Sequence, residues 1–386
     1  MENLKKIEFG EIAELRKEKF NPETSTEIKP CLELEHFEQV TGKINGFVPS
    51  SEQKSIKNVF YRGDVLFGKL RPYLRKYWLA EFDGVCSSEV WVLKPKSKEI
   101  SNEYLFNLIQ TNDFIQAANV SSGSKMPRAD WDYIINFPFS IINSKTEQKA
   151  IAKVLSTWDE AIHKTEQLIA QKELRKKWLM QNLLTGKKRL KGFGGEWKEM
   201  LLGDMFTERN ETKYYDLPLL SIGQNGVYPQ DESIKKDTSN EDKSKYKRIC
   251  PGDIGYNTMR MWQGRSALSE LEGIVSPAYT VVTPKKNADS IFFSYLFKMP
   301  KMTNLFWRNS QGLVDDTLNC KFKDFSIVKT MLPSTKEEQT AIAQVLQAAD
   351  KEISLFKAKA EKLREQKKGL MQVLLTGKVR LKINDI

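Results

Sequence analysis

The chain has 386 residues, 40% hydrophobic and 29% charged, which is ordinary for a globular protein with room for two or three domains. No apolar run approaches the roughly 18 residues that would cross a bilayer, and the N-terminus lacks the apolar core of a secretory signal. Four widely spaced cysteines and two histidines disfavour a structural zinc site and favour a reduced, cytoplasmic setting, while the net charge of +11 favours a polyanionic partner.

Residues 1–143 contain short strand-like apolar runs separated by Gly and Pro turn signals. This pattern predicts a first domain of mixed α/β structure.

Residues 144–186 are typical of one long helix. Ser144 and Glu147 fit the capping box S-x-x-E, in which the serine hydroxyl accepts from a backbone amide and the glutamate reaches back to the cap amide. Gly186 suits the left-handed position just past a helix C-terminus. An apolar seam at heptad spacing is interrupted at Thr165, Lys172 and Lys176. The seam consists of Leu155, Trp158, Ile162, Ile169, Leu179 and Leu183.

Residues 187–333 predict a second mixed domain that resembles the first only faintly. The segments "YRGDVLFGKLRPYLRKYW" and "CPGDIGYNTMRMWQGRSA" share a Gly-Asp pair followed by an apolar strand. The scaffold is therefore expected to repeat while its surface differs.

Residues 334–377 predict a second long helix, followed by a tail at residues 378–386. Thr335 and Glu338 form a matching capping box, and Gly377 a matching helix stop. Its seam is broken only at Lys367, and comprises Leu346, Ala349, Ile353, Phe356, Ala360, Leu363, Leu370 and Leu374.

The two helices are copies of one another, 191 positions apart. "EQKAIAKVL" matches "EQTAIAQVL" at their starts, and "LLTGKKRLK" matches "LLTGKVRLK" at their ends. Across the two segments 22 of 45 positions are identical, too many for two unrelated amphipathic helices. We therefore expect an α+β chain in which the two helices pair as an antiparallel coiled coil with pseudo-two-fold symmetry.

In this order of elements the chain resembles the specificity subunit of type I restriction–modification enzymes, with two target recognition domains and two spacer helices. The resemblance rests on the twinned "EQ-x-A-I-A-x-V-L" starts, the twinned "L-M-Q-x-L-L-T-G-K" ends and the two "GD-V/I" segments. It covers nearly the whole chain.

The resemblance implies a subunit that catalyses nothing and reads a bipartite double-stranded DNA site. Because the two globular parts differ, that site is expected to be asymmetric. The helices would act as a ruler between the half-sites and dock two methyltransferase subunits, which restriction subunits can join. S-adenosylmethionine, ATP and Mg would be bound by those partners and not by this chain.

Two other functions remain open on the residues alone. A self-contained methyltransferase or nuclease is disfavoured, because "LLTGK" lacks the remaining residues of a phosphate-binding loop. Asp315 and Asp316 form an acidic pair without the further acid and lysine of a metal-dependent nuclease. A coiled-coil adaptor without sequence readout would bind DNA with salt dependence only.

Side chains that suit phosphates and base edges occur in four segments, two in each domain. The candidates in the first domain are Lys69, Arg71, Tyr73, Arg75, Lys76, Ser124, Lys125 and Arg128. Those in the second domain are Asn257, Arg260, Trp262, Gln263, Arg265, Arg308, Asn309 and Gln311.

A four-residue unit, "TEQL" at residues 165–168, resembles one that varies in copy number in this family. Each extra copy would add about 6 Å of helix. A second copy is expected to widen the gap in the recognised site.

Overall fold

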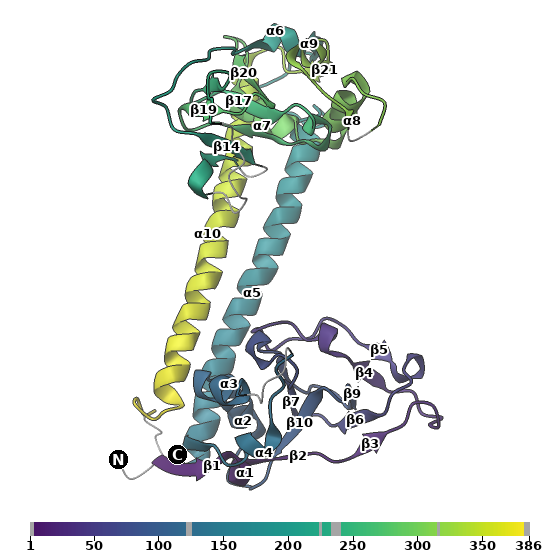
Figure 1. The fold of residues 1–386 in the computed structure, drawn as a ribbon, viewed down its shortest axis with the longest axis vertical. Coiled ribbons are helices and arrows are strands. Elements are labelled where there is room, and N and C mark those ends of the chain that lie inside the picture. The colour runs from purple at the N-terminus through teal and green to yellow at the C-terminus, as the bar shows by residue number, and fades with distance from the viewer. Residues whose placement is uncertain (1–3, 121–125, 224–225, 233–240, 315–316, 382–386) are drawn as a thin grey trace. The chain divides into compact units, whose positions relative to one another are not determined.

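The computed structural model describes residues 4–120, 126–223, 226–232, 241–314 and 317–381. The chain forms two compact units (Figure 1). Unit 1 comprises residues 1–166 and 358–386, and unit 2 comprises residues 167–357. The long helices α5 (Lys145–Leu183) and α10 (Lys336–Leu374) each contribute residues to both units.

The described residues of unit 1 form three sheets and four short helices. The sheets are ordered β1-β11, β2-β10-β7-β8 and β3-β6-β9-β4-β5. The strands are β1 (Leu4–Glu8), β2 (Ala13–Leu15), β3 (Lys19–Phe20), β4 (Pro30–Leu32), β5 (Val48–Pro49), β6 (Lys57–Phe60), β7 (Val65–Gly68), β8 (Tyr77–Leu79), β9 (Gly84–Cys86), β10 (Val90–Pro95) and β11 (Pro138–Ile142). The helices are α1 (Phe9–Ile12), α2 (Asn102–Leu108), α3 (Asn112–Ala118) and α4 (Trp131–Ile134), with 3-10 turns η1 (Leu34–His36), η2 (Ser50–Glu52) and η3 (Pro72–Leu74).

The described residues of unit 2 follow a similar order of elements, with fewer strands between β13 and β17 than unit 1 has between β2 and β7. The sheets of unit 2 are β12-β21, β13-β20-β17-β18, β14-β15 and β16-β19. The strands are β12 (Lys198–Leu201), β13 (Phe206–Glu208), β14 (Leu220–Gly223), β15 (Gly226–Pro229), β16 (Lys247–Ile249), β17 (Ile254–Asn257), β18 (Ser266–Leu268), β19 (Gly273–Val275), β20 (Tyr279–Pro284) and β21 (Lys329–Leu332). The helices are α6 (Leu202–Met205), α7 (Ser290–Leu296), α8 (Pro300–Asn309) and α9 (Phe322–Ser326), with 3-10 turns η4 (Gln230–Glu232) and η5 (Met261–Gln263).

The central four-stranded sheet of unit 1 is buried on both faces. Successive side chains of a strand point to opposite faces, so Trp91 and Leu93 of β10 enter the core beneath the short helices. Val90 and Val92 enter a second core with residues of β4 and β6. This explains why β10 has the sequence of an unbroken apolar run rather than an alternating one.

Both long helices are part of the core of each unit. Ile151 and Leu155 of α5 pack in unit 1 with Leu374 of α10. In unit 2, Leu183 of α5 packs with Leu346 of α10. Burial of one such side chain contributes about 1.5–3 kcal/mol. Each globular part is therefore stabilised by the start of one helix and the end of the other.

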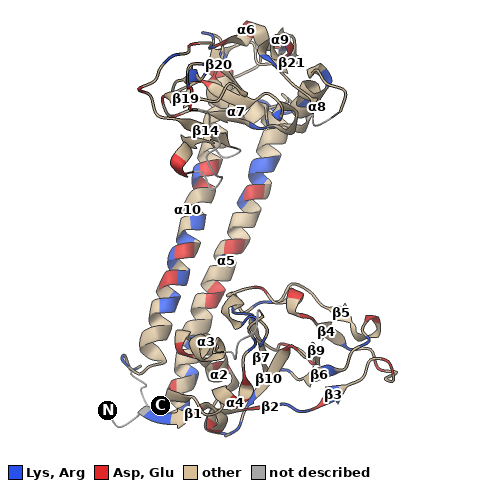
Figure 2. Ribbon diagram, in the orientation of Figure 1, with Lys and Arg blue, Asp and Glu red and all other residues tan. Residues whose placement is uncertain are grey.

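Within each unit the two helices run antiparallel, as the sequence predicts. Two of the lysines that interrupt the apolar seam form ion pairs with the other helix. Lys367 donates to Asp159 at 2.7 Å in unit 1. The equivalent Lys176 donates to Asp350 at 2.5 Å in unit 2. Figure 2 shows the acidic and basic residues that alternate along both helices. The seam lysines thus replace apolar contacts by ion pairs across the helix pair.

Both helices stop as the sequence predicts. Gly186 and Gly377, just past their ends, have φ of 70° and 68°. This left-handed conformation penalises residues that carry a Cβ.

Candidate nucleic-acid interface

A short 3-10 turn, η3, presents candidate residues of unit 1. Arg71 precedes the turn and Arg75 follows it, and both have a left-handed backbone, with φ of 53° and 52°. Such conformations are uncommon for residues other than glycine and are costly unless the surrounding structure holds them. The Tyr73 side chain between them is 51% exposed, and Arg71 is also exposed.

The two basic residues that follow this turn make internal hydrogen bonds. The Arg75 guanidinium donates to Asn112 Oδ1 at 2.7 Å and to the Gln110 carbonyl at 3.3 Å. Lys76 Nζ donates to the Leu34 carbonyl at 2.6 Å. Both side chains therefore hold the turn against neighbouring elements.

The second predicted segment of unit 1 lies directly beside this turn. The Arg71 amide donates to the Pro127 carbonyl at 2.8 Å, and the Ala129 amide donates to the Lys69 carbonyl at 2.8 Å. Arg128 is exposed and pairs with Glu89 at 3.1 Å. The fold thus brings Lys69, Arg71 and Arg128 to one surface, while Ser124 and Lys125 lie outside the described residues.

Unit 2 has the equivalent turn, η5, with different side chains. The Cys320 amide donates to the Thr258 carbonyl at 2.8 Å, and the adjacent Asn319 exchanges backbone hydrogen bonds with Gln311 at 2.8 and 2.9 Å, so the two predicted segments are linked through residues 319 and 320. Asn257 Oδ1 accepts from the Met259 amide at 3.0 Å, and Trp262 Nε1 donates to the Met259 carbonyl at 3.1 Å. Gln263 and Arg265 are exposed beside this turn.

Of the remaining candidates of unit 2, Arg260 lies before η5, and Arg308, Asn309 and Gln311 lie at and after the end of α8. Arg260 immediately precedes η5 and is half-buried, whereas Arg308 is exposed. Asn309 Nδ2 donates to the Leu305 carbonyl at 2.9 Å, so this amide is used within the helix. Gln311 is exposed and pairs through its backbone with Asn319. The acidic pair Asp315 and Asp316 lies outside the described residues.

The Gly-Asp segments support the strands that precede both turns, a role that sequence reasoning missed. In unit 1 the Asp64 carboxylate accepts from Arg16 at 2.7 and 2.8 Å and from the Tyr61 amide at 2.8 Å. In unit 2 the Asp253 carboxylate accepts from Arg209 at 2.7 Å. Asp64 and Asp253 are buried, and bidentate arginine pairs of this kind are geometrically specific.

The glutamates of the predicted capping boxes have another role. The Ser144 hydroxyl does accept from the Glu147 amide, at 3.4 Å. The Glu147 carboxylate, however, accepts from Arg380 Nε at 2.7 Å and not from the cap amide. The prediction of a reciprocal box is therefore wrong at Glu147, because a guanidinium from the segment after α10 competes for the buried carboxylate.

The second copy makes the same contact with the helices exchanged. The Glu338 carboxylate accepts from Arg189 at 2.5 and 2.6 Å, so the reciprocal box is wrong here too. Arg189 and Arg380 are the arginines of the two "LLTGK-x-RLK" repeats. Each repeat thus binds the start of the other helix, and we call this contact the Glu–Arg clasp.

The clasp lowers the pKa of one carboxyl group. The hydrogen bond from Arg380 holds the pKa of Glu147 below its ordinary value of 4.5, against the opposing effect of burial. Glu147 is only 3% exposed. The clasp is therefore present as an ion pair at neutral pH.

In the described residues, no helix is both long enough and apolar enough to cross a membrane. The same part of the chain contains no group of three or more His, Cys, Asp or Glu residues placed to hold a metal ion.

Comparison with known proteins gives a consistent set of relatives. A family model described as "Type I restriction modification DNA specificity domain" matches residues 1–171 and 194–365. The EcoDI type I restriction enzyme specificity subunit of Escherichia coli is 30% identical over 169 residues, 42% of this chain and 35% of that protein. The putative MjaX specificity subunit of Methanocaldococcus jannaschii is 27% identical over 381 residues, 87% of this chain and 83% of that protein.

Two solved structures share the fold. A chain from a study of complex assembly and conformational transition in a type I R-M system has a TM-score of 0.63 at 17% identity, covering 98% of this chain and 99% of that one. The HsdS subunit from Thermoanaerobacter tengcongensis has a TM-score of 0.53 at 17% identity, with 98% of both chains covered.

Proposed function

Because the chain belongs to the family of type I restriction–modification DNA specificity subunits, we propose that each of its units reads one half of a bipartite double-stranded DNA site. The observation that carries this proposal is the repeated turn beside the central sheet. One scaffold presents Arg71 and Tyr73 in unit 1, and Gln263 and Arg265 in unit 2. Different side chains on equivalent turns require different half-sites, so the whole target is asymmetric.

The side chains within each turn have different tasks in this proposal. Arg71 and Arg265 suit guanine, and Gln263 suits adenine, through bidentate contacts in the major groove. Lys69 and Arg308 supply phosphate contacts, which position the protein but carry no sequence information. Arg75 and Lys76 hold the unit 1 turn in place through the internal bonds described above.

Chemistry on the DNA is assigned to partner subunits. We propose that α5 and α10 set the distance between the half-sites and bind two methyltransferase subunits, which restriction subunits can join. S-adenosylmethionine, ATP and Mg would be held by those partners, with this chain contributing DNA recognition in the cytoplasm.

The deciding experiment is single-molecule methylation mapping of genomic DNA from a host that expresses this chain with its cognate methyltransferase subunit. We expect one asymmetric, interrupted motif that disappears when this chain is removed. A continuous or palindromic motif would contradict the assignment of one half-site to each unit.

The purified chain alone provides the control for the enzyme alternative. Incubated with DNA, Mg²⁺ and S-adenosylmethionine, it should neither methylate nor cleave. An adaptor without readout would instead bind all sequences with the same salt dependence.

A further inference from the structure

The end of α5 in unit 2 carries an exposed apolar stripe. Leu174 and Trp178 are 68% and 47% exposed. At 100° per residue they lie on one face of α5, and the exposed Thr185 lies in the turn that follows the helix. Large exposed apolar residues in a row are typical of an interaction surface.

A cation holds the tryptophan of this stripe in place. Lys188 Nζ lies 4.6 Å from the Trp178 ring centroid. Such a cation–π contact stabilises one orientation of the ring. The indole is therefore partly ordered before any partner binds, which lowers the entropic cost of binding.

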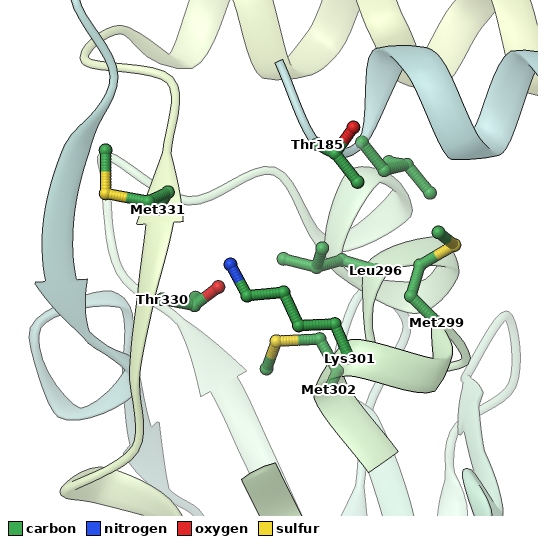
Figure 3. A pocket seen from close by; sticks show the side chains of 8 residues that line it. Thr185, Leu296, Met299, Lys301, Met302, Thr330 and Met331 are labelled. Carbon is green, nitrogen blue, oxygen red and sulfur yellow. The ribbon is translucent and has the colours of Figure 1, made fainter. Parts of the chain in front are cut away.

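A hollow lined by methionines begins at Thr185, in the turn that follows α5. Figure 3 shows Thr185 beside a small pocket whose walls include Met299, Met302 and Met331. Lys301 extends across this pocket with its ammonium group toward Thr330 (Figure 3). Flexible methionine side chains adapt to an inserted apolar group, and the lysine suits a carboxylate next to it.

Unit 1 lacks this surface at the equivalent positions. The counterparts of Leu174 and Trp178 on α10 are Glu365 and Gly369, and the counterpart of Lys188 is Val379. The two units therefore present surfaces of different chemistry at the same place in the fold.

The borders of the stripe indicate what it binds. Arg175 and Lys177 flank it on either side and are exposed, as is Lys188 at its end. An apolar strip with basic borders complements an amphipathic helix with acidic borders. The α5 segment that carries it belongs to the helix pair to which the proposed function assigns the methyltransferase.

We propose that the Leu174–Trp178 stripe and the methionine-lined hollow bind an acidic amphipathic helix of the methyltransferase subunit, and that the first of two such subunits binds at unit 2. This inference rests on the proposed function and goes beyond it. Two identical partners that meet two different surfaces bind with different affinities. The complex should therefore assemble in order, with unit 2 occupied before unit 1.

The test titrates the full chain with methyltransferase subunit and follows stoichiometry by native mass spectrometry. Trp178→Ala should weaken binding of the first partner about tenfold or more and change the second less than twofold. Lys188→Val, which installs the residue of the other repeat, should weaken the first step about threefold.

A matched control lies on the other helix of the same unit. Leu355 is 63% exposed, close to the value for Leu174. Leu174→Ser should weaken the first step about tenfold, whereas Leu355→Ser should leave it unchanged. Equal effects of both substitutions would overturn the proposal, and unchanged melting temperatures would exclude misfolding as the cause.

Hydrogen exchange identifies which unit is occupied first. At substoichiometric methyltransferase, residues 171–185 should be protected before residues 362–376. Simultaneous protection, or the reverse order, would overturn the inference while leaving DNA recognition intact. If the wild-type complex produced no sequence-specific methylation motif, the proposed function would be contradicted instead.

Discussion

Arg71 and Arg75 flank the same turn and share the same left-handed backbone, yet their surroundings differ. Arg75 is bound to Asn112 and to the Gln110 carbonyl, whereas Arg71 is exposed beside Lys69 and Arg128. Composition could not separate them, because both are arginines in one basic segment. Their roles depend on α3, whose position relative to the turn is set by tertiary packing.

This difference gives a matched pair of substitutions. Arg71→Ala should weaken binding to the specific site by about 1–3 kcal/mol, the value of a bidentate base contact, with an unchanged melting temperature. Arg75→Ala should lower the stability of the protein by about 1 kcal/mol through loss of its internal hydrogen bonds. DNA binding by fluorescence anisotropy and thermal unfolding measure the two effects. Unchanged affinity of the Arg71 variant would remove this residue from the interface.

The ion pair at Glu147 should make stability depend on pH. Arg380 lowers the pKa of Glu147 in the folded state. The ion pair therefore contributes fully to the free energy of unfolding above a pH of about 4.5, the ordinary pKa of glutamate. This contribution is lost as the pH falls through the lower pKa of the folded state. Between neutral pH and the acid range, the wild-type chain should therefore lose more stability than Glu147→Gln, which cannot titrate. Chemical denaturation at a series of pH values provides the comparison. Parallel curves for the two proteins would show that the pair contributes nothing.

At the scale of elements, the repeat and its helices could be predicted from sequence because their signals are local. Helix stops at Gly186 and Gly377, and the apolar seam, depend on spacing along the chain. The Glu–Arg clasp could not be predicted, because it joins residues 147 and 380, which are adjacent only after both helices have paired. The capping-box motif is misleading here, because a glutamate carboxylate can accept hydrogen bonds either from the cap amide or from an arginine.

The length of α5 should determine the gap in the DNA site. A second "TEQL" inserted after Leu168 adds about 6 Å to α5. Methylation mapping should then show a gap longer by one or two base pairs. Gln167→Ala with Leu168→Ala changes the same region without changing its length, and should leave the gap as it is. An unchanged gap after the insertion would exclude the ruler role.

At the scale of the whole molecule, the two units share the four-stranded sheet and its flanking elements but differ in their other sheets and at their surfaces. The five-stranded sheet of unit 1 has, among the described residues of unit 2, the two-stranded pairs β14-β15 and β16-β19 as its counterparts. Sequence comparison of the halves showed the shared scaffold at the Gly-Asp segments. It could not show which side chains the scaffold leaves at the surface.

The charge pairs of the helices also distinguish one half of the chain from the other. Glu166 pairs with Arg364 at 2.6 Å in unit 1, and Glu173 pairs with Lys357 at 2.7 Å in unit 2. When the two repeats are aligned, Glu166 corresponds to Lys357 and Glu173 corresponds to Arg364. The sign of the charge is therefore reversed between the copies at both positions. Two N-terminal halves paired in this way would bring Glu166 against Glu173, and two C-terminal halves would bring Lys357 against Arg364.

Separate halves, divided between Phe193 and Gly194, should therefore associate with each other in preference to themselves. Glu173→Lys in the N-terminal half should strengthen its self-association about tenfold, since two repulsive contacts become two attractive ones at a few tenths of a kcal/mol each. Analytical ultracentrifugation of the single and mixed halves measures this. Glu160→Lys, a change of the same charge at an exposed position that pairs within its own helix, is the control.

The Glu–Arg clasp does not distinguish pairing of unlike halves from pairing of like halves, because Arg189 and Arg380 could each bind either glutamate. The two copies in a duplicated chain must be similar enough to pair as one scaffold. They must also differ enough that each copy does not pair with the same copy of another chain. In this molecule the ends of the two helices are nearly identical in sequence, whereas Glu166 and Glu173 in the middle of the first helix correspond to residues of opposite charge in the second. Whether two halves pair would thus depend on a few surface charges in the middle of α5 and α10.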